Sequence, residues 1–157
     1  MVKATMANDP SKDPAPGVCN NTAVRKAARH LTRFYDACMA ETNLRGTQYS
    51  VLNTLARKGP ITIAALAELL TMDRATMGHN LRPLERDGLV TIKVGRDDRR
   101  VREVALSAKG RRREAESKAH WIRAQRQFEK EFGAEDALAM RRMMARITMM
   151  SLDKEKP

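Results

Sequence analysis

Residues 62–107 read TIAALAELLTMDRATMGHNLRPLERDGLVTIKVGRDDRRVREVALS, and this stretch decides the expected fold. Thr62 is placed to cap a helix over 63–70, and Asp73 to cap a second helix that ends at Asp87-Gly88. The turn Thr71-Met72-Asp73 joins them, which is typical of a helix-turn-helix. The apolar sides of the two helices are expected at Leu66, Leu69 and Leu70 in the first and at Met77, Leu81 and Leu84 in the second.

A charged β-hairpin is expected next. Val90, Ile92 and Val94 alternate with polar residues over 89–94, as do Val104 and Leu106 over 101–106. The intervening residues 95–100 are Gly-Arg-Asp-Asp-Arg-Arg, a polar hairpin tip. A helix-turn-helix followed at once by such a hairpin predicts a winged helix.

Helical patterns flank this stretch on both sides. Residues 1–18 hold three prolines among small and charged residues and are expected to form a disordered tail. Helical spacing of apolar residues then runs from Asn20 to a break at 43–46, and Thr47 is the expected cap of a helix that ends near Lys58. Ser107 is the expected cap of a long helix, and a last, methionine-rich helix covers about 135–152. The fold class is therefore mainly α with a small β-hairpin wing.

The bulk composition limits the possible functions. With 157 residues, 42% of them apolar, and a net charge of +11, the chain suits a folded domain with a surface for polyanions. The six aromatic residues disfavour a single-strand binder that stacks bases. No apolar run approaches the ~20 residues of a membrane span, and two cysteines without a secretory leader favour the cytoplasm.

The positive charge gathers on the winged helix. The span 74–113 holds twelve Lys or Arg and five Asp or Glu, a net +7. A helix suits the major groove of duplex DNA, and a hairpin can reach the adjacent minor groove. Asp97 and Asp98 are expected to hold the hairpin tip by pairing with arginine rather than to bind metal, and no cofactor is expected. The expected DNA-binding residues are Arg74, Thr76, His79, Asn80, Arg82 and Arg86 on the helix and Arg96, Asp98, Arg99 and Arg100 on the wing.

Three motifs make the sequence resemble the multiple-antibiotic-resistance regulator (MarR) family of bacterial winged-helix transcription factors. They are Leu66-Ala67-Glu68-Leu69-Leu70, then Leu84-Glu85-Arg86-Asp87-Gly88-Leu89-Val90, and then Asp98-Arg99-Arg100 followed by Leu106-Ser107-Ala108-Lys109-Gly110. The resemblance implies a homodimer, with 19–46 as an N-terminal dimerisation helix, 47–107 as the DNA-binding domain and 108–152 as C-terminal dimerisation helices. Where many members carry Thr-Arg or Ser-Arg, this chain has Gly78-His79, which shifts the expected specificity to Arg74, Arg82 or Thr76.

The resemblance also implies a small aromatic or acidic effector. Arg33, Tyr35, Tyr49 and Trp121 are the candidates for its pocket; the alternative is that Tyr35 and Trp121 are simply buried at the dimer interface. Cys19 lies at a position similar to the reactive cysteine of the family's peroxide-sensing branch, which makes a redox-sensing repressor the alternative function, with an inert thiol as its counterpart. The methionine cluster of the last helix is expected to fill a core or an interface.

The sequence as a whole predicts a homodimeric repressor that reads a pseudo-palindromic operator in double-stranded DNA. A non-specific architectural DNA-binding protein is the second hypothesis. An enzyme is not expected, because the chain has no glycine-rich phosphate loop, G-x-S-x-G or H-E-x-x-H motif.

Overall fold

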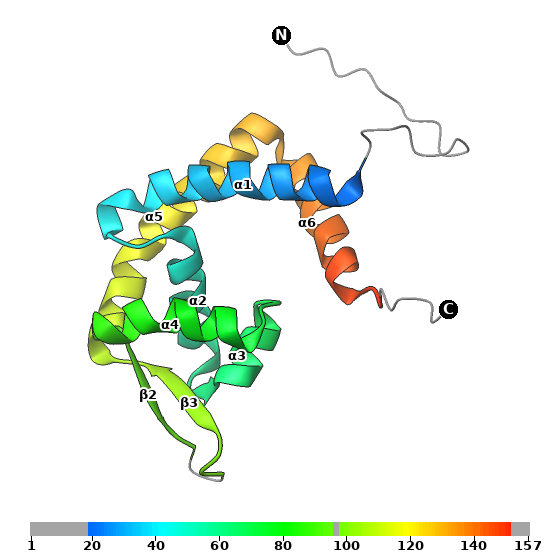
Figure 1. Cartoon of the computed structure of the whole chain (residues 1–157). Coiled ribbons are helices and arrows are strands. Elements are labelled where there is room, and N and C mark those ends of the chain that lie inside the picture. Colours follow the sequence, from blue (N-terminus) through cyan, green and yellow to red (C-terminus); the bar gives the residue numbers. More distant parts are fainter. Residues whose placement is uncertain (1–18, 96–97, 152–157) are drawn as a thin grey trace, which may run out of the picture. The chain divides into compact units, whose positions relative to one another are not determined.

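A computed structural model describes residues 19–95 and 98–151 of the chain (Figure 1). It divides into two compact units, one ending at Phe34 and the other beginning at Tyr35. Helix α1 (Asn20–Met39) supplies the described part of the first unit and the start of the second. The units are described separately below, and the second contains the predicted winged helix.

The elements follow the predicted order, so the mainly helical winged-helix class is confirmed. Their bounds are η1 (Ala40–Thr42), α2 (Gly46–Lys58), β1 (Ile61–Thr62), α3 (Ile63–Leu69), α4 (Arg74–Arg86), β2 (Val90–Val94), β3 (Arg102–Leu106), α5 (Ala108–Phe132) and α6 (Ala134–Met149).

Three predicted helix caps are confirmed. The hydroxyl of Thr62 accepts a hydrogen bond from the N–H of Ala65, and the carboxylate of Asp73 accepts one from the N–H of Thr76. The hydroxyl of Ser107 accepts from the N–H of Gly110. Each satisfies an N–H group that the first turn of a helix leaves without a partner, which fixes where α3, α4 and α5 begin.

The sheet has one strand that the sequence did not indicate. Strand β3 pairs antiparallel with β2, with Val104 opposite Ile92, and also pairs with β1, with Val104 opposite Ile61. The described strands therefore run in the order β1-β3-β2. Strand β1 has two residues, too few to show the alternation by which a strand is recognised in a sequence.

One hydrophobic core holds the winged helix together. Met77, Leu81 and Leu84 of α4 are buried as predicted, together with Leu66 of α3 and Val104 of β3. At about 25 cal/mol per Å² of apolar surface, full burial of one such side chain contributes roughly 1.5 to 3 kcal/mol. The core therefore fixes which face of α4 is left for solvent.

Several apolar predictions were wrong. Leu69 is 50% exposed because α3 ends at that residue, and Val94 is 45% exposed at the end of β2. The predicted cap at Thr47 is also wrong, because α2 begins at Gly46 and its cap position is Arg45, two residues before Thr47. In α5 the buried residues are Gly110, Ser117 and Ala124. Ala115 and Ala119, which lie at helical spacing with the apolar residues of this helix, are exposed.

Helix α6 has little apolar burial of its own. Among its residues only Ala137 is buried, whereas Met143, Met144 and Ile147 are exposed, as is Met150 just after the helix. The methionines therefore do not fill a core of this chain, and the other half of the prediction, that they fill an interface, stays a prediction. No helix within the described residues is long and apolar enough to span a bilayer.

Candidate nucleic-acid interface

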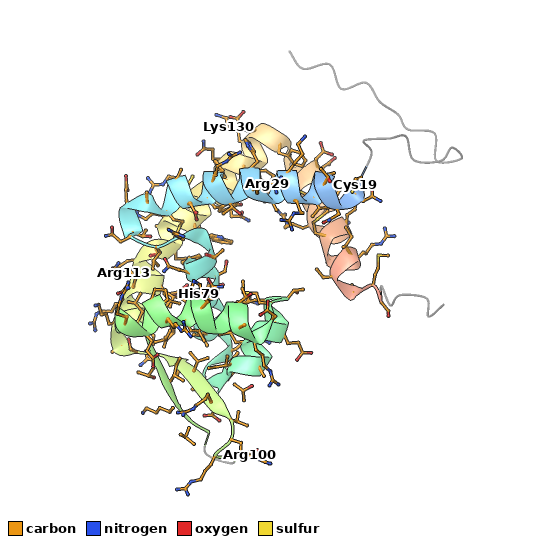
Figure 2. All side chains as sticks on the ribbon, viewed as in Figure 1. Cys19, Arg29, His79, Arg100, Arg113 and Lys130 are labelled. Carbon is orange, nitrogen blue, oxygen red and sulfur yellow. The ribbon has the colours of Figure 1, made fainter. Side chains whose placement is uncertain are left out.

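Helix α4 presents its polar face to solvent. With Met77, Leu81 and Leu84 buried, the side chains of Arg74, His79, Arg82 and Arg86 are exposed, and Asn80 is partly buried. Figure 2 labels His79 on this helix. The structure therefore brings the predicted helix residues onto one accessible surface.

Thr76 and Asn80 already have hydrogen-bond partners. The hydroxyl of Thr76 donates to Oδ2 of Asp73 at 2.6 Å, and the amide of Asn80 donates to the sulfur of Met72 at 3.6 Å. The Thr76 hydroxyl and its backbone N–H together hold the pKa of Asp73 below its usual range. Thr76 is thus part of the helix cap as well as a predicted DNA contact, a role that sequence spacing alone did not reveal.

A polar groove of about 640 Å³ runs between α4 and the start of α2. Its α4 side is formed by His79, Asn80, Arg82, Pro83 and Arg86, and its α2 side by Arg45, Thr47 and Gln48. Sequence analysis missed the α2 side because those residues precede the α4 residues of the groove by more than thirty positions.

Polar contacts fix the start of α2. The N–H of Arg45 donates to Oε1 of Gln48 at 2.9 Å, and the N–H of Gly46 donates to Oδ1 of Asp36 at 2.7 Å. A Cβ at Gly46 would lie 3.3 Å from the Cβ of Tyr35, so α2 begins close against the end of α1 in the second unit. These two hydrogen bonds and this close packing fix the backbone conformation at Arg45.

The wing carries a second basic group. Asp98 accepts bonds from the backbone N–H of Arg100 and from both Nε and Nη2 of its guanidinium, each at about 3 Å. These bonds hold the pKa of Asp98 below its usual range. The expected pairing of an aspartate with an arginine is thus confirmed for Asp98, and Figure 2 shows Arg100 at the far end of the hairpin. Arg99 is exposed beside it, whereas the predicted Arg96 and Asp97 lie outside the described residues.

The base of the wing is packed tightly against α5. The hydroxyl of Ser107 donates to the carbonyl of Gly88 at 2.6 Å, and Nζ of Lys109 donates to the carbonyl of Asp87 at 2.8 Å. A Cβ at Gly110 would lie 1.9 Å from the carbonyl oxygen of Leu89, so only glycine fits there. This close approach explains the glycine of the Leu-Ser-Ala-Lys-Gly motif and fixes the hairpin relative to α5.

The four residues predicted for an effector pocket are not seen to line one common pocket among the described residues. Tyr49 is 2% exposed and its hydroxyl donates to Glu114 at 3.4 Å, while Trp121 is 36% exposed with its ring 6.2 Å from that of Tyr49. Tyr35 donates to Gln125. Arg33 belongs to the first unit. In this single chain Tyr35 is partly buried and Trp121 is exposed, so the alternative that both are buried at a dimer interface stays a prediction.

The Tyr49 hydroxyl holds its proton more tightly than the hydroxyl of a solvent-exposed tyrosine does. Burial, with the carboxylate of Glu114 beside it, raises the pKa of Tyr49 to about 12. Asn53 donates to the same carboxylate at 3.1 Å, so Glu114 of α5 is tied to two side chains of α2. Sequence analysis missed this contact, because nothing in the local pattern pairs residues so far apart.

Cys19 is exposed directly before α1. Hydrogen bonds from the side chain and the backbone of Thr22 lower the pKa of its thiol. Among the described residues, no group of three or more His, Cys, Asp or Glu side chains is arranged to hold a metal ion.

A helix-turn-helix with a basic outer face, followed by a basic wing, defines a winged-helix protein of the transcription-regulator class. A protein-family model described as the MarR family matches residues 44–101. The M. tuberculosis transcriptional regulator MOSR, solved with DNA, is 30% identical, with a TM-score of 0.76 over 83% of this chain and 94% of that chain. The chain therefore belongs to the MarR family, whose members are transcriptional regulators rather than enzymes.

Two further relatives fit this assignment. The transcriptional repressor CouR, solved on a 23-mer DNA duplex, is 25% identical over 82% of this chain and 92% of its own, with a TM-score of 0.74. An organic hydroperoxide resistance transcriptional regulator of Bacillus subtilis (strain 168) is 27% identical over 84 residues. That match spans 54% of this chain and 57% of the relative.

Proposed function

We propose that this chain is a homodimeric, sequence-specific repressor that binds a pseudo-palindromic operator in duplex DNA. The observation that carries the proposal is the exposed polar face of α4, with Arg74, His79, Arg82 and Arg86 available to base edges and phosphates. The DNA complexes of MOSR and CouR support the same partner, and CouR supports repression. Arg99 and Arg100 on the wing are proposed to contact the neighbouring minor groove.

The homodimer is supported by the exposed apolar side chains of α6. Met143 is 52% exposed and Ile147, one helical turn later, is 43% exposed, and Met150 just after the helix is 58% exposed. An apolar group of this kind marks an interaction surface in a chain that otherwise carries a large net charge. We propose that a second copy of the same chain covers it, and a two-fold dimer of this kind reads half-sites about one turn of DNA apart.

Random-sequence selection tests sequence specificity. The full chain is incubated with a random duplex library, and the bound duplexes are recovered and sequenced over successive rounds. We expect a pseudo-palindrome with half-sites about one helical turn apart. Enrichment of no motif despite binding would instead support the architectural DNA-binding protein and would contradict the proposal.

Release by a small aromatic or acidic effector is the third part of the proposal. The aromatic pair Tyr49 and Trp121 lies where α2 packs against α5, so a ligand there would touch both the DNA-binding part and the long helix that follows it. Benzoate-type acids tested against a preformed DNA complex should release DNA from the wild type and not from Trp121→Leu. Release of both proteins alike would contradict this site.

A redox alternative is favoured by Cys19. Its thiol is exposed and has a lowered pKa, and thiolate is the form that reacts with peroxides. The hydroperoxide-related name of the Bacillus subtilis relative supports the same idea. Treatment with an organic hydroperoxide should then lower DNA binding of the wild type, while Cys19→Ser keeps it. An equal response of the two proteins would remove this alternative.

A further inference from the structure

The groove between α2 and α4 has a composition that suits a phosphodiester. Of its eight lining residues three are arginine and one is histidine, and none is Asp or Glu. Arg86 is paired with Asp87 at 3.1 Å on the surface. Within residues 19–95 and 98–151, neither Arg45 nor Arg82 forms an ion pair with an acidic side chain. Two guanidinium groups therefore face a common groove without a counter-charge.

The two sides of the groove come from different helices. On duplex DNA bound as proposed above, helix α4 faces the base edges of the major groove, and the start of α2 faces the sugar-phosphate backbone beside it. A helix with its side chains is about 10 to 12 Å wide and fills a major groove of about 12 Å. When α4 lies in the major groove, residues beside it meet the flanking sugar-phosphate strands rather than the base edges. Arg45, at the start of α2, lies on this flank across the groove from Arg82 and Arg86.

The ordered backbone at Arg45 suits a contact that positions the protein on DNA. Its own N–H is held by Gln48, and the next N–H is held by Asp36, while the preceding residue, Leu44, is 5% exposed in the core. The backbone is thus ordered before any ligand arrives, which lowers the entropy lost on binding. The guanidinium itself remains exposed and has the fork geometry that matches phosphate oxygens.

We infer that this groove seats a backbone phosphate of duplex DNA and that Arg45 is its main ligand, with Arg82 on the opposite side. This inference rests on the proposed DNA-binding function and adds a contact from outside the helix-turn-helix and the wing. Such a contact carries no base information. It sets how far α4 enters the major groove and contributes equally on every sequence.

Arg45→Gln is the test variant and Arg57→Gln the matched control, since each removes one exposed arginine, the first at the cap position before α2 and the second in its last turn. Fluorescence anisotropy measures binding of each full-length protein to a selected duplex and to a scrambled one across a range of salt concentrations. We expect Arg45→Gln to weaken both duplexes by a similar factor, about fivefold. The slope of log K against log salt should become shallower by about 1, and Arg57→Gln should keep the wild-type slope.

Three outcomes overturn the inference while leaving the proposed function intact. They are equal slopes for the two variants, a loss confined to the selected duplex, or binding of inorganic phosphate that Arg45→Gln abolishes without any change in the DNA slope. The last would make the groove a small-anion site. Arg45→Lys keeps the positive charge and should keep the wild-type slope. That result would show that the change in Arg45→Gln comes from the lost charge and not from a folding defect caused by replacing Arg45. Failure of the wild type to bind any duplex would instead contradict the proposed function itself.

Discussion

The winged helix and helix α6 place their apolar side chains in opposite ways. In the winged helix, Met77 and Leu84 of α4 are fully buried, whereas Met143 and Ile147 of α6 are 52% and 43% exposed. The winged helix therefore completes its core within one chain. Helix α6 carries apolar side chains like those of a core helix, but no other part of the described chain buries them. Its apolar face therefore needs another molecule to cover it. Changes in the first region should act on the stability of one chain, and changes in the second on association.

The largest effect is expected at Gly110, where α5 passes the carbonyl group of Leu89. A methyl group at Gly110 would lie 1.9 Å from the carbonyl oxygen of Leu89, so Gly110→Ala must displace the wing or α5. We expect the free energy of unfolding to fall by about 3 kcal/mol, measured by urea denaturation. Gly78→Ala in α4 is the control, since a Cβ there meets nothing within 4 Å, and it should leave stability unchanged or raise it by up to about 1 kcal/mol. Similar losses for both would contradict the contact.

In α6 the expected effect is on association. The double variant Met143→Glu with Ile147→Glu places two charges on the exposed apolar face and should raise the dimer dissociation constant by about 100-fold or more. Analytical ultracentrifugation should then find a mass near 17.7 kDa instead of twice that value. Ala145→Glu, on a different face of the same helix, should remain dimeric. A dimer that survives the double variant would move the interface away from α6.

Base reading by α4 can be separated from phosphate binding. Arg74→Ala, which removes an exposed arginine outside the groove, should weaken the selected duplex by about 10-fold and relax the preference at one position of each half-site. The scrambled duplex should lose less. Competition between duplexes that differ at single positions measures this, and a uniform loss on all of them would assign Arg74 to phosphate alone.

A smaller effect is expected at the wing. Asp98 holds Arg100 through three hydrogen bonds, so Asp98→Ala frees the guanidinium while it adds one net positive charge. We expect DNA affinity to fall about threefold, because the arginine loses its fixed position. A rise in affinity would mean that charge alone governs the wing.

The smallest effect concerns Tyr49 at alkaline pH. The pKa of its hydroxyl is raised to about 12 in the fold, above the usual value of about 10 for an unfolded chain. The folded state therefore holds this proton more tightly, so its contribution to stability is complete below pH 10 and is lost as the pH rises toward 12. Wild-type protein should lose more free energy of unfolding over this range than Tyr49→Phe does. Parallel curves for the two proteins would contradict the buried tyrosine.

Local chemistry made most of the winged helix predictable. Thr62, Asp73 and Ser107 fix helix starts through bonds to N–H groups a few residues away, and such contacts can be inferred from spacing. The inner side of α4 followed from its helical period in the same way. The hairpin was also predicted to within a residue or two, because alternation and a polar tip are short-range signals.

Contacts between distant segments were not predictable. Asp36 holds the start of α2, and Glu114 binds Tyr49 and Asn53 across more than sixty positions. Arg45 and Gln48 entered the candidate site only through the packing of α2 beside α4. The exposure of Leu69 and Val94 likewise depends on where α3 and β2 end against their neighbours, which periodicity does not determine.

The salt dependence of binding tests the central claim most directly. The account holds that exposed basic residues of α4, the wing and the groove neutralise DNA phosphates. For about six to ten contacts, affinity for the selected duplex should fall by about 10³ to 10⁵ between about 50 and 200 mM salt. A steep, linear fall of log K against log salt is the predicted result, and an affinity that stays constant over this range would contradict the account.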